Sequence, residues 1–239
     1  MTQNDITPLI LAGGKGTRLR SVLPDYPKIL VEVAGRPFIT YLLDQLVESG
    51  FRKVILCTGY KAKTVEKKLG DKYKSMDISY SSEEKPLGTA GAVRKAMGLV
   101  RSELILVLNG DSYLDFKLSD FINRYLGDKI DFAIVLTEAE DTSRFGRVDI
   151  DENSKVKSFN EKGVSGKGHI NAGIYLLKSD FMNTIPAGGF VSFEKDIFPG
   201  LADKSGIAAY PVASDFIDIG TPESFHSAET FFKRMGKNS

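Results

Sequence analysis

The sequence has little of what several kinds of functional site require. It contains one cysteine, Cys57, and two histidines, so an internal disulfide is excluded and a zinc site is not expected. Cys57 closes the apolar run at 54–57, which favours a small buried side chain over a reactive thiol. No apolar run approaches the roughly 18 residues that span a bilayer, and the first residues lack the basic and apolar segments of a signal peptide. We therefore expect a cytoplasmic protein without a membrane partner.

Charge of neither sign is in excess. Lys and Arg number 32 against 31 Asp and Glu, for a net charge of +1, which gives no general attraction to nucleic acid. Hydrophobic residues make up 42% and charged residues 26% of the 239 residues, the composition of a folded chain. Low-complexity linkers, runs of like charge and hexapeptide repeats are missing as well. We expect one domain over 1–239, no β-helix, and only a local site for an anion.

Short apolar runs alternate with helical patterns in the first half of the chain. Strands are predicted at 9–12, 53–58, 78–81 and 104–108, and helices at 38–47, 62–69 and 89–100. Pro37 and Gly50 frame the first helix, at its first position and just beyond its end. Runs this apolar indicate strands that are covered on both faces, as in a parallel sheet.

After Asp111 the pattern changes to strands with few helices between them. Strands are predicted at 132–136, 147–150, 156–159 and 170–177, and helices at about 193–201 and from Thr221, whose hydroxyl caps a helix that starts with Pro222. We predict an α/β fold: a Rossmann-like, mixed but mainly parallel central sheet flanked by helices, with a strand-rich elaboration in the second half.

The glycine-rich segment LAGGKGTRLR at 11–20 follows the first predicted strand. Ligands of open parallel sheets bind at the carboxyl ends of the strands, and glycines let backbone N–H groups approach an anion. Lys15, Arg18 and Arg20 add charge that suits a triphosphate. The segment is not a P-loop, and Leu19 replaces the third glycine of a dinucleotide-binding turn. We interpret it as a triphosphate-binding loop, with a surface turn of solvated cations as the alternative.

Two aspartates stand in or directly after apolar runs. Asp111 follows the run at 104–108, and Asp218 lies within FIDI at 216–219. A carboxylate in such surroundings needs a compensating partner, and Mg²⁺ is commonly held by one or two carboxylates together with phosphates and water. We predict that both aspartates bind Mg²⁺. The alternatives are a helix cap, an ion pair with a lysine or, for Asp218, support of the turn near Thr221.

Six motifs resemble, in kind and order, those of the sugar-1-phosphate nucleotidyltransferases. They are GGKGTRL at 13–19 with PK at 27–28, PLGTAG at 86–91, LNGD at 108–111, FNEK at 159–162, NAGIY at 171–175 and FIDIG at 216–220. The set covers nearly the whole chain. Its spacing is most similar to that of the bacterial D-glycero-α-D-manno-heptose 1-phosphate guanylyltransferases, although PLGTAG also occurs in relatives that make GDP-mannose.

The resemblance implies that a sugar 1-phosphate attacks the α-phosphorus of a nucleoside triphosphate and displaces pyrophosphate. It implies catalytic roles for Arg18, on the departing phosphates, and Lys28, on the α-phosphate, with Mg²⁺ as cofactor. GTP and the heptose 1-phosphate are the favoured substrates, and mannose 1-phosphate is the alternative sugar. The nucleotide-binding part is expected at about 1–115, and the sugar-phosphate-binding part at about 116–239.

Further residues match binding positions of the family. For the nucleotide they are Leu11, Ala12, Gly13, Gly14, Lys15, Gly16, Thr17, Gly59, Tyr60, Gly88 and Thr89, with Thr89 the leading candidate for a base contact. For the sugar phosphate they are Glu161, Lys162, Asn171, Gly173 and Glu194. A turn glycine, an exposed loop aromatic and a first-turn glutamate are equally good readings of Gly88, Tyr60 and Glu194. Arg144 fits a solvated loop cation better than a sugar contact.

Other classes of protein fit less well. A nicotinamide oxidoreductase usually has an acidic residue at the end of its second strand, where Thr58 and Gly59 stand, and a GTP-dependent switch needs a P-loop. Many glycosyltransferases carry the pattern Asp-x-Asp, and the residues that start at Asp111 do not match it. A non-catalytic nucleotide-binding module stays open as the alternative. Such a module is expected to lack one or more of Arg18, Lys28, Asp111 and Asp218, and all four are present. Phe231 and Phe232 fit either a core or an interface, which leaves a homo-oligomer open.

Overall fold

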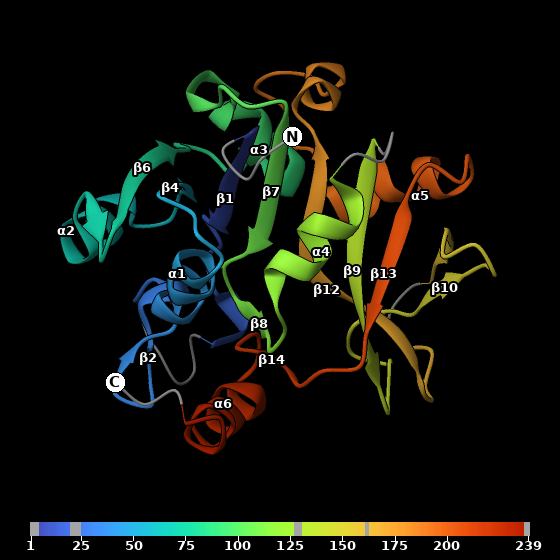
Figure 1. Cartoon of the computed structure of the whole chain (residues 1–239). Helices are drawn as coiled ribbons and strands as arrows, with labels where there is room; N and C mark the ends of the chain where they lie inside the picture. The colour runs from blue at the N-terminus through green and yellow to red at the C-terminus, as the bar shows by residue number, and fades with distance from the viewer. Residues whose placement is uncertain (1–4, 20–24, 127–130, 161–162, 237–239) are drawn as a thin grey trace.

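A mixed sheet of ten strands runs through this computed structural model, which describes residues 5–19, 25–126, 131–160 and 163–236 (Figure 1). The central strands β1 (Ile6–Ala12), β4 (Lys53–Thr58), β6 (Met76–Ser82) and β7 (Leu104–Asn109) are parallel. On one side the sheet ends with the short β5 (Lys72–Tyr73). On the other side β12 (Gly168–Lys178) follows β7, and the sheet then branches. One branch is β9 (Phe132–Ala139) and β13 (Ala208–Val212), and the other is β10 (Val148–Ile150) and β11 (Val156–Phe159).

Helices cover both faces of the sheet, because successive side chains of the central strands point to opposite faces. Ile10 packs into one buried cluster, under α1 (Ile39–Glu48), α4 (Leu118–Tyr125) and α6 (Pro222–Arg234). Leu9 packs into the other cluster, under α3 (Gly88–Ala96), a π-helical turn (Phe193–Ile197) and α5 (Phe198–Ala202). Figure 1 shows α1 and α4 in front of the sheet and α3 behind it. The predicted fold class is confirmed.

Most predicted elements are present, and the differences have local causes. Pro37 does not open the first helix: it pairs with Glu32 between β2 (Glu32–Val33) and β3 (Arg36–Pro37), and α1 begins at Ile39. The helix predicted at 89–100 leaves α-geometry after Ala96 and ends as a 3₁₀ turn. The short α4 and the edge strand β13, which contains Pro211, were not predicted. Proline is tolerated there because β9 is the one described strand that pairs with β13, and the isolated bridge on its other side involves Ala208 rather than Pro211.

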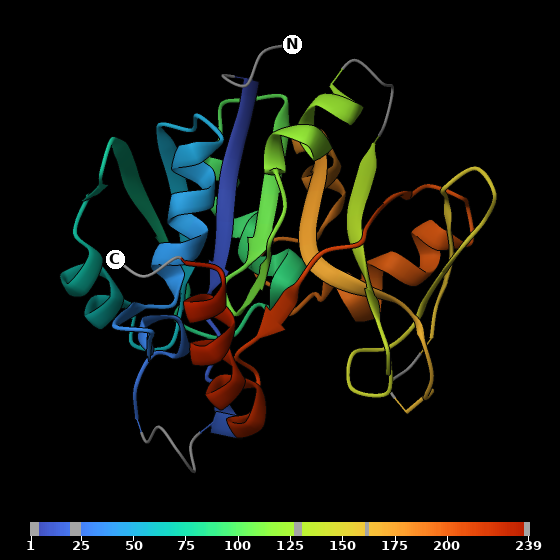
Figure 2. The ribbon, with the colours of Figure 1, turned by 60° about the horizontal axis from the view of Figure 1, so that its bottom comes forward.

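The C-terminal helix α6 belongs to the core. Phe232 is fully buried, and its ring stacks on that of Tyr41 with the two ring centroids 3.6 Å apart. Phe231 is 9% exposed. The two residues are therefore core residues, and they supply no argument for an oligomer. Figure 2 shows α6 beside a small two-stranded sheet formed by β8 (Ser112–Leu114) and β14 (Phe216–Asp218). None of the helices in the described part of the chain has the length and apolar character needed to cross a membrane.

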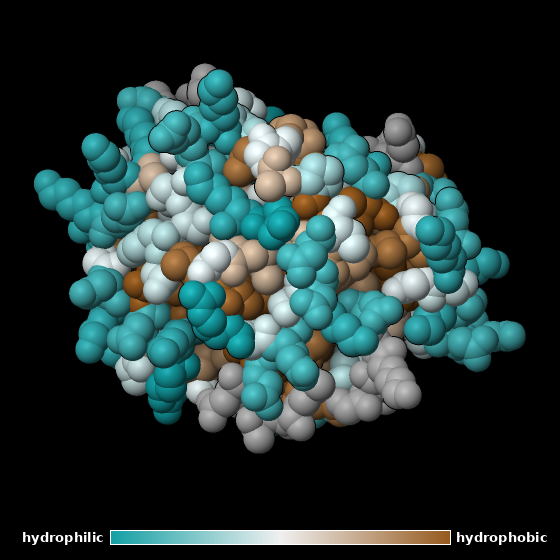
Figure 3. Space-filling view, turned by 90° about the horizontal axis from the view of Figure 1, so that it is seen from above, coloured by the Kyte–Doolittle hydropathy of each residue, from teal (hydrophilic) through white to brown (hydrophobic). Residues whose placement is uncertain are grey.

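Figure 3 looks onto the end of the sheet where β1 begins, and it shows hydrophilic residues interspersed with hydrophobic ones. A cavity of about 710 Å³ lies there, lined among others by Phe51, Leu99 and Arg101. Ligands of parallel sheets bind at the opposite, carboxyl ends of the strands. The functional site is therefore expected at that opposite end.

An ionic cluster around Asp44 ties β3 and the turn after β5 to α1. Arg36 Nη1 lies 2.5 Å from Asp44 Oδ2, and Tyr73 donates to Asp44 Oδ1 at 2.9 Å. Lys74 Nζ completes the cluster at 2.5 Å from Oδ1. Burial of the Asp44 carboxyl raises its pKa, but the hydrogen bonds from Lys74, Arg36 and Tyr73 outweigh burial, so that the pKa is lowered from its ordinary value.

We predict that Asp44→Asn lowers the free energy of unfolding at pH 7 by about 2 kcal/mol, because it leaves the partly buried donors of Arg36 and Tyr73 without an ionised acceptor. A lowered pKa stabilises the folded state above the unfolded value of 3.8, and this stabilisation is lost as the pH falls through the folded pKa. Urea unfolding at pH 7 and near pH 3 should show the difference from wild type shrinking in acid. The control Asp77→Asn breaks an exposed pair with Lys72 and should change little. An equal loss in both variants would contradict the prediction.

Candidate functional site

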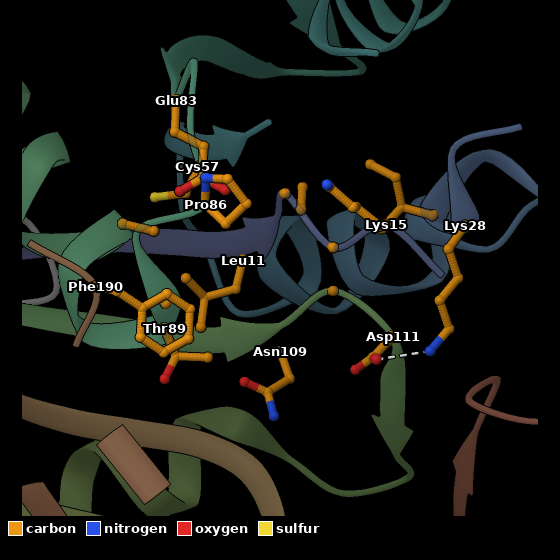
Figure 4. Close-up of a pocket in the computed structure, with 17 residues that line it drawn as sticks. Leu11, Lys15, Lys28, Cys57, Glu83, Pro86, Thr89, Asn109, Asp111 and Phe190 are labelled. Carbon is orange, nitrogen blue, oxygen red and sulfur yellow. Dashed lines mark hydrogen bonds and ion pairs between the residues drawn. The ribbon is translucent and has the colours of Figure 1, made fainter. Parts of the chain in front are cut away.

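A cavity of about 410 Å³ opens at the carboxyl ends of β1, β4, β6 and β7 (Figure 4). Residues predicted from the sequence form just over half of its lining: Leu11, Ala12, Gly13, Gly14, Lys15, Lys28, Gly88, Thr89 and Asp111. The remaining lining residues were not predicted: Ile29, Cys57, Glu83, Pro86, Ala92, Asn109, Gly110 and Phe190. Figure 4 shows Lys15, Lys28 and Asp111 at one end, and Glu83, Pro86, Thr89 and Phe190 toward the other.

The cationic end is built from the glycine-rich loop and Lys28. Lys28 opens a short 3₁₀ turn whose other residues, Ile29 and Leu30, are buried, which fixes its backbone. Its Nζ lies 2.7 Å from Asp111 Oδ2, and the two side chains are 11% and 48% exposed. Gly16 has a φ of +56°, and a Cβ there would come within 3.3 Å of the Lys28 Cβ. The loop therefore packs closely against Lys28.

The pairing of β8 with β14 brings Asp218 next to Asp111. Asp218 lies opposite Ser112, and the amide of Ile219 donates to the carbonyl oxygen of Asp111 at 2.9 Å. Asp218 Oδ1 accepts from the amide of Gly220 at 2.6 Å and from Ser224 Oγ at 2.9 Å. Asp218 therefore supports the turn that follows it, which is the alternative to metal binding that the sequence offers for this residue.

A cation also contacts the second carboxylate. Arg144 Nη2 lies 3.2 Å from Asp218 Oδ2, and the Arg144 side chain is 49% exposed, so this loop cation is largely solvated, as predicted, and also pairs with a carboxylate. A Cβ on Gly220 would come within 2.7 Å of Asp218 Oδ1 and 3.7 Å of Lys28 Nζ, which places Lys28 near both carboxylates. Over the described residues, no group of three or more His, Cys, Asp or Glu side chains could hold a metal ion. A cation bound here would need ligands from phosphates and water besides the two aspartates.

The opposite end of the cavity contains the carboxylate of Glu83, directly after β6. Glu83 Oε2 accepts from the amide of Leu87 at 3.0 Å. A Cβ on Gly59 would approach Oε1 to 2.7 Å, and one on Gly13 to 2.9 Å, so both glycines leave room for this side chain. Burial raises the pKa of Glu83, against the opposing effects of the Leu87 amide and the charge of Lys95. The only sequence signal for Glu83 was its place between a strand end and PLGTAG.

Cys57 lies beside Glu83 in the same lining. Its side chain is 2% exposed, and burial, together with the charge of Glu83, raises the pKa of the thiol to about 12. The prediction of a small buried side chain is confirmed.

The hydroxyl of Thr89 joins the start of α3 to the π-helical turn. It donates to Glu194 Oε2 at 2.8 Å and accepts from the amide of Phe193 at 2.8 Å. Glu194 also accepts from Ser192 Oγ at 2.7 Å. Thr89 thus lines the cavity while its hydroxyl is engaged within the protein, and Glu194 lies behind it, outside the lining.

Asn171 and Gly173 also lie behind the lining, on β12. Asn171 Nδ2 donates to the hydroxyl of Tyr175 at 2.8 Å, and its Oδ1 accepts from the amide of Gly173 at 2.8 Å. Gly173 has a φ of +77°, and a Cβ there would come within 2.7 Å of Asn109 Nδ2. Tyr175 is fully buried, and burial followed by the charge of Glu194 raises its pKa well above its ordinary value. These residues support Asn109, which does line the cavity.

Several predicted residues lie elsewhere. Thr17 and Arg18 are exposed on the 3₁₀ turn Thr17–Leu19, and neither lines the cavity. The amide of Tyr60 donates to the carbonyl oxygen of Gly13 at 3.3 Å, and its hydroxyl bonds to Asp25. Glu161 and Lys162 lie outside the described residues.

The chain is similar in sequence to known nucleotidyltransferases. Residues 7–234 match the family model described as nucleotidyl transferase. The chain is 34% identical over 221 residues to D-glycero-alpha-D-manno-heptose 1-phosphate guanylyltransferase of Aneurinibacillus thermoaerophilus, which covers 92% of this chain and 96% of that protein. It is 35% identical over 229 residues to the mannose-1-phosphate guanylyltransferase of Mycobacterium tuberculosis, which covers 94% of this chain but 64% of that longer protein.

A solved structure agrees with the sequence comparison. The crystal structure of HddC from Yersinia pseudotuberculosis complexed with GMP-PN matches with a TM-score of 0.84 at 35% identity. The match covers 95% of this chain and 99% of HddC.

Proposed function

Because this chain belongs to the nucleotidyl transferase family, as its motifs indicated, we propose that it transfers GMP from GTP to D-glycero-α-D-manno-heptose 1-phosphate. A phosphate oxygen of the sugar 1-phosphate attacks the α-phosphorus of GTP, the bond between the α-phosphorus and the bridging oxygen breaks, and pyrophosphate leaves. The observation that carries the proposal is the polarity of the cavity, with cations and an aspartate at one end and a half-buried carboxylate at the other.

The cationic end suits the triphosphate. The reaction needs positioning and charge neutralisation more than a protein nucleophile. The loop at 13–16, with Lys15, would hold the phosphates. Lys28 would neutralise charge on the α-phosphate, because its Nζ is placed to contact an anionic oxygen at this end of the cavity, as its 2.7 Å distance from a carboxylate oxygen indicates. For Arg18, the role on the departing phosphates rests on the motif alone.

The opposite end suits guanine. An ionised carboxylate only accepts hydrogen bonds, and guanine presents N–H donors on its N1 and N2 atoms. Adenine presents an acceptor at N1, which would face Glu83 unfavourably. One Glu83 oxygen already accepts from Leu87, at 3.0 Å, and the other lies toward Gly13 and Gly59. HddC has been solved with the guanine nucleotide GMP-PN, which supports the same base here.

The sugar phosphate is proposed to bind against the second half of the chain, through Asn171, Gly173, Glu194, Glu161 and Lys162. Relatives named for the heptose and for mannose match at nearly equal identity, 34% and 35%. The heptose is preferred because its enzyme is matched over 96% of its length. We propose further that the reaction takes place in the cytoplasm without nucleic acid or membrane; self-association stays a prediction.

Members of this family generally use a divalent metal ion, and we propose Mg²⁺, held by Asp111 and Asp218. Two carboxylates at the same end of one small sheet, Asp111 directly before β8 and Asp218 at the end of β14, fit a hard cation that also takes phosphate oxygens and water. When bound, such an ion would neutralise the triphosphate and orient it for in-line attack.

The function predicts one productive substrate pair. Pyrophosphate release should be measured with Mg²⁺ for the heptose 1-phosphate, mannose 1-phosphate and glucose 1-phosphate, each against GTP, ATP, UTP, CTP and dTTP. We expect turnover with GTP and a manno-configured sugar, highest with the heptose. Silence across all pairs, from a folded protein that still binds GTP in calorimetry, would favour the non-catalytic module.

We predict that Asp111→Asn lowers kcat/KM by about 100-fold or more and raises the Mg²⁺ concentration needed for half-maximal rate, because a charged ligand becomes a neutral one. The matched control is Asp203→Asn, an exposed residue at the end of α5, which should keep wild-type kinetics. Unchanged turnover and Mg²⁺ dependence in Asp111→Asn would show that the metal assignment is wrong.

We predict that Glu83→Gln lowers kcat/KM for GTP by about 100-fold and brings it close to the value for ATP, because an amide nitrogen then faces a base donor. The neighbour Glu84 is exposed, so Glu84→Gln serves as control.

The same variant tests the raised pKa of Glu83. A raised pKa stabilises the folded state below the unfolded value of 4.5, and this contribution is lost as the pH rises through the folded pKa. At pH 7, Glu83→Gln should therefore be at least as stable as wild type. A large loss of stability at pH 7 would mean that Glu83 has a structural role instead.

A further inference from the structure

Phe190 is an exposed aromatic side chain at the edge of the cavity. It is 66% exposed and belongs to the lining, and among the described residues no ring pair includes it. Figure 4 shows its ring beside Thr89 and on the far side of Leu11 from Lys15 and Lys28. Large apolar side chains near a cavity lose unfavourable contact with water when a ligand covers them.

The backbone that carries Phe190 is held firmly against α3. The carbonyl oxygen of Val191 accepts from the amides of Ala90 and Gly91 at 3.0 and 3.1 Å, and the Val191 amide donates to Leu87 at 2.8 Å. A Cβ on Gly88 would come within 2.4 Å of the Val191 oxygen. A Cβ on Gly91 would come within 2.8 Å of the Gly189 oxygen. The segment on both sides of Phe190 therefore cannot move away from the helix start without breaking these contacts.

The ligand group nearest to Phe190 follows from the polarity of the cavity. In the proposed complex the phosphates lie toward Lys15 and Lys28. The base then lies toward Glu83, Pro86 and the start of α3, where the ring of Phe190 also lies. The residues proposed for the sugar on β12, Asn171 and Gly173, do not line this cavity. The ring accordingly borders the base end.

We infer that Phe190 stacks on the guanine base of bound GTP and closes the outer end of the cavity. The inference rests on the proposed function for the choice of nucleotide. Aromatic rings stack on any base, so Phe190 supplies affinity, and the carboxylate of Glu83 supplies selectivity.

The absence of tryptophan from the sequence allows a direct test. Phe190→Trp places the sole indole at this position, and its fluorescence should be quenched saturably by GMP and by GTP but not by ribose 5-phosphate. Leu99→Trp is the matched control, because Leu99 is 48% exposed and lines the cavity at the other end of the sheet. Its fluorescence should not respond. Quenching of Phe190→Trp by mannose 1-phosphate alone would place the ring on the sugar and overturn the inference.

Affinity gives a second readout. Phe190→Ala should raise the Kd for GTP by about fivefold to thirtyfold, and Phe190→Tyr should restore it. Calorimetry on wild type separates the two levels of the argument. If wild type binds GTP but Phe190→Trp stays unquenched and Phe190→Ala binds normally, the stacking role is wrong and the proposed function stands. If wild type does not bind GTP, the proposed function itself fails.

Discussion

The site depends on one contact between distant parts of the chain, the antiparallel pairing of β8 with β14. Two strands of three residues are too short to be stable alone, so their position depends on what packs against them. Tyr113 of β8 is buried. The centroid of its ring lies 6.2 Å from that of Phe231 and 5.1 Å from that of Phe232. The C-terminal helix therefore sets the position of Asp111 and Asp218, although none of its residues lines the cavity.

The charges at this contact are compensated before any substrate arrives. Lys28 is only 11% exposed and is paired with Asp111, and Arg144 contacts Asp218. A buried charge that loses its partner is costly, whereas one that changes partners is not. In the proposed reaction Lys28 passes from a carboxylate to a phosphate, and the carboxylate passes to a cation. The ion pair between Lys28 and Asp111 is therefore compatible with the proposed role of Asp111 as a metal ligand, because the same charges exchange partners when substrate and metal bind.

Local patterns predicted most of the fold, because apolar runs and helix caps act over a few residues. Thr221 is the clearest example: its side chain forms a capping box with Ser224, and Pro222 begins the helix. Contacts between distant residues could not be predicted in this way. The sequence makes Thr89 the leading candidate for a base contact, yet its hydroxyl bonds to Glu194, 105 positions away. Glu83 is one of two adjacent glutamates, and only the sheet places it in the cavity while its neighbour stays exposed.

The base selection proposed for Glu83 depends on this side chain and on two backbone positions. An ionised carboxylate in a half-buried setting destabilises the ligand-free protein, and a ligand with two suitably placed N–H donors removes that penalty. The missing side chains of Gly13 and Gly59 leave room for the observed position of Glu83, since a Cβ on either would approach its Oε1 to less than 3 Å. These glycines directly follow β1 and β4, so their relative position is fixed by the parallel pairing of Ala12 with Thr58. The selectivity proposed for Glu83 is therefore a property of the central sheet as much as of the carboxylate itself.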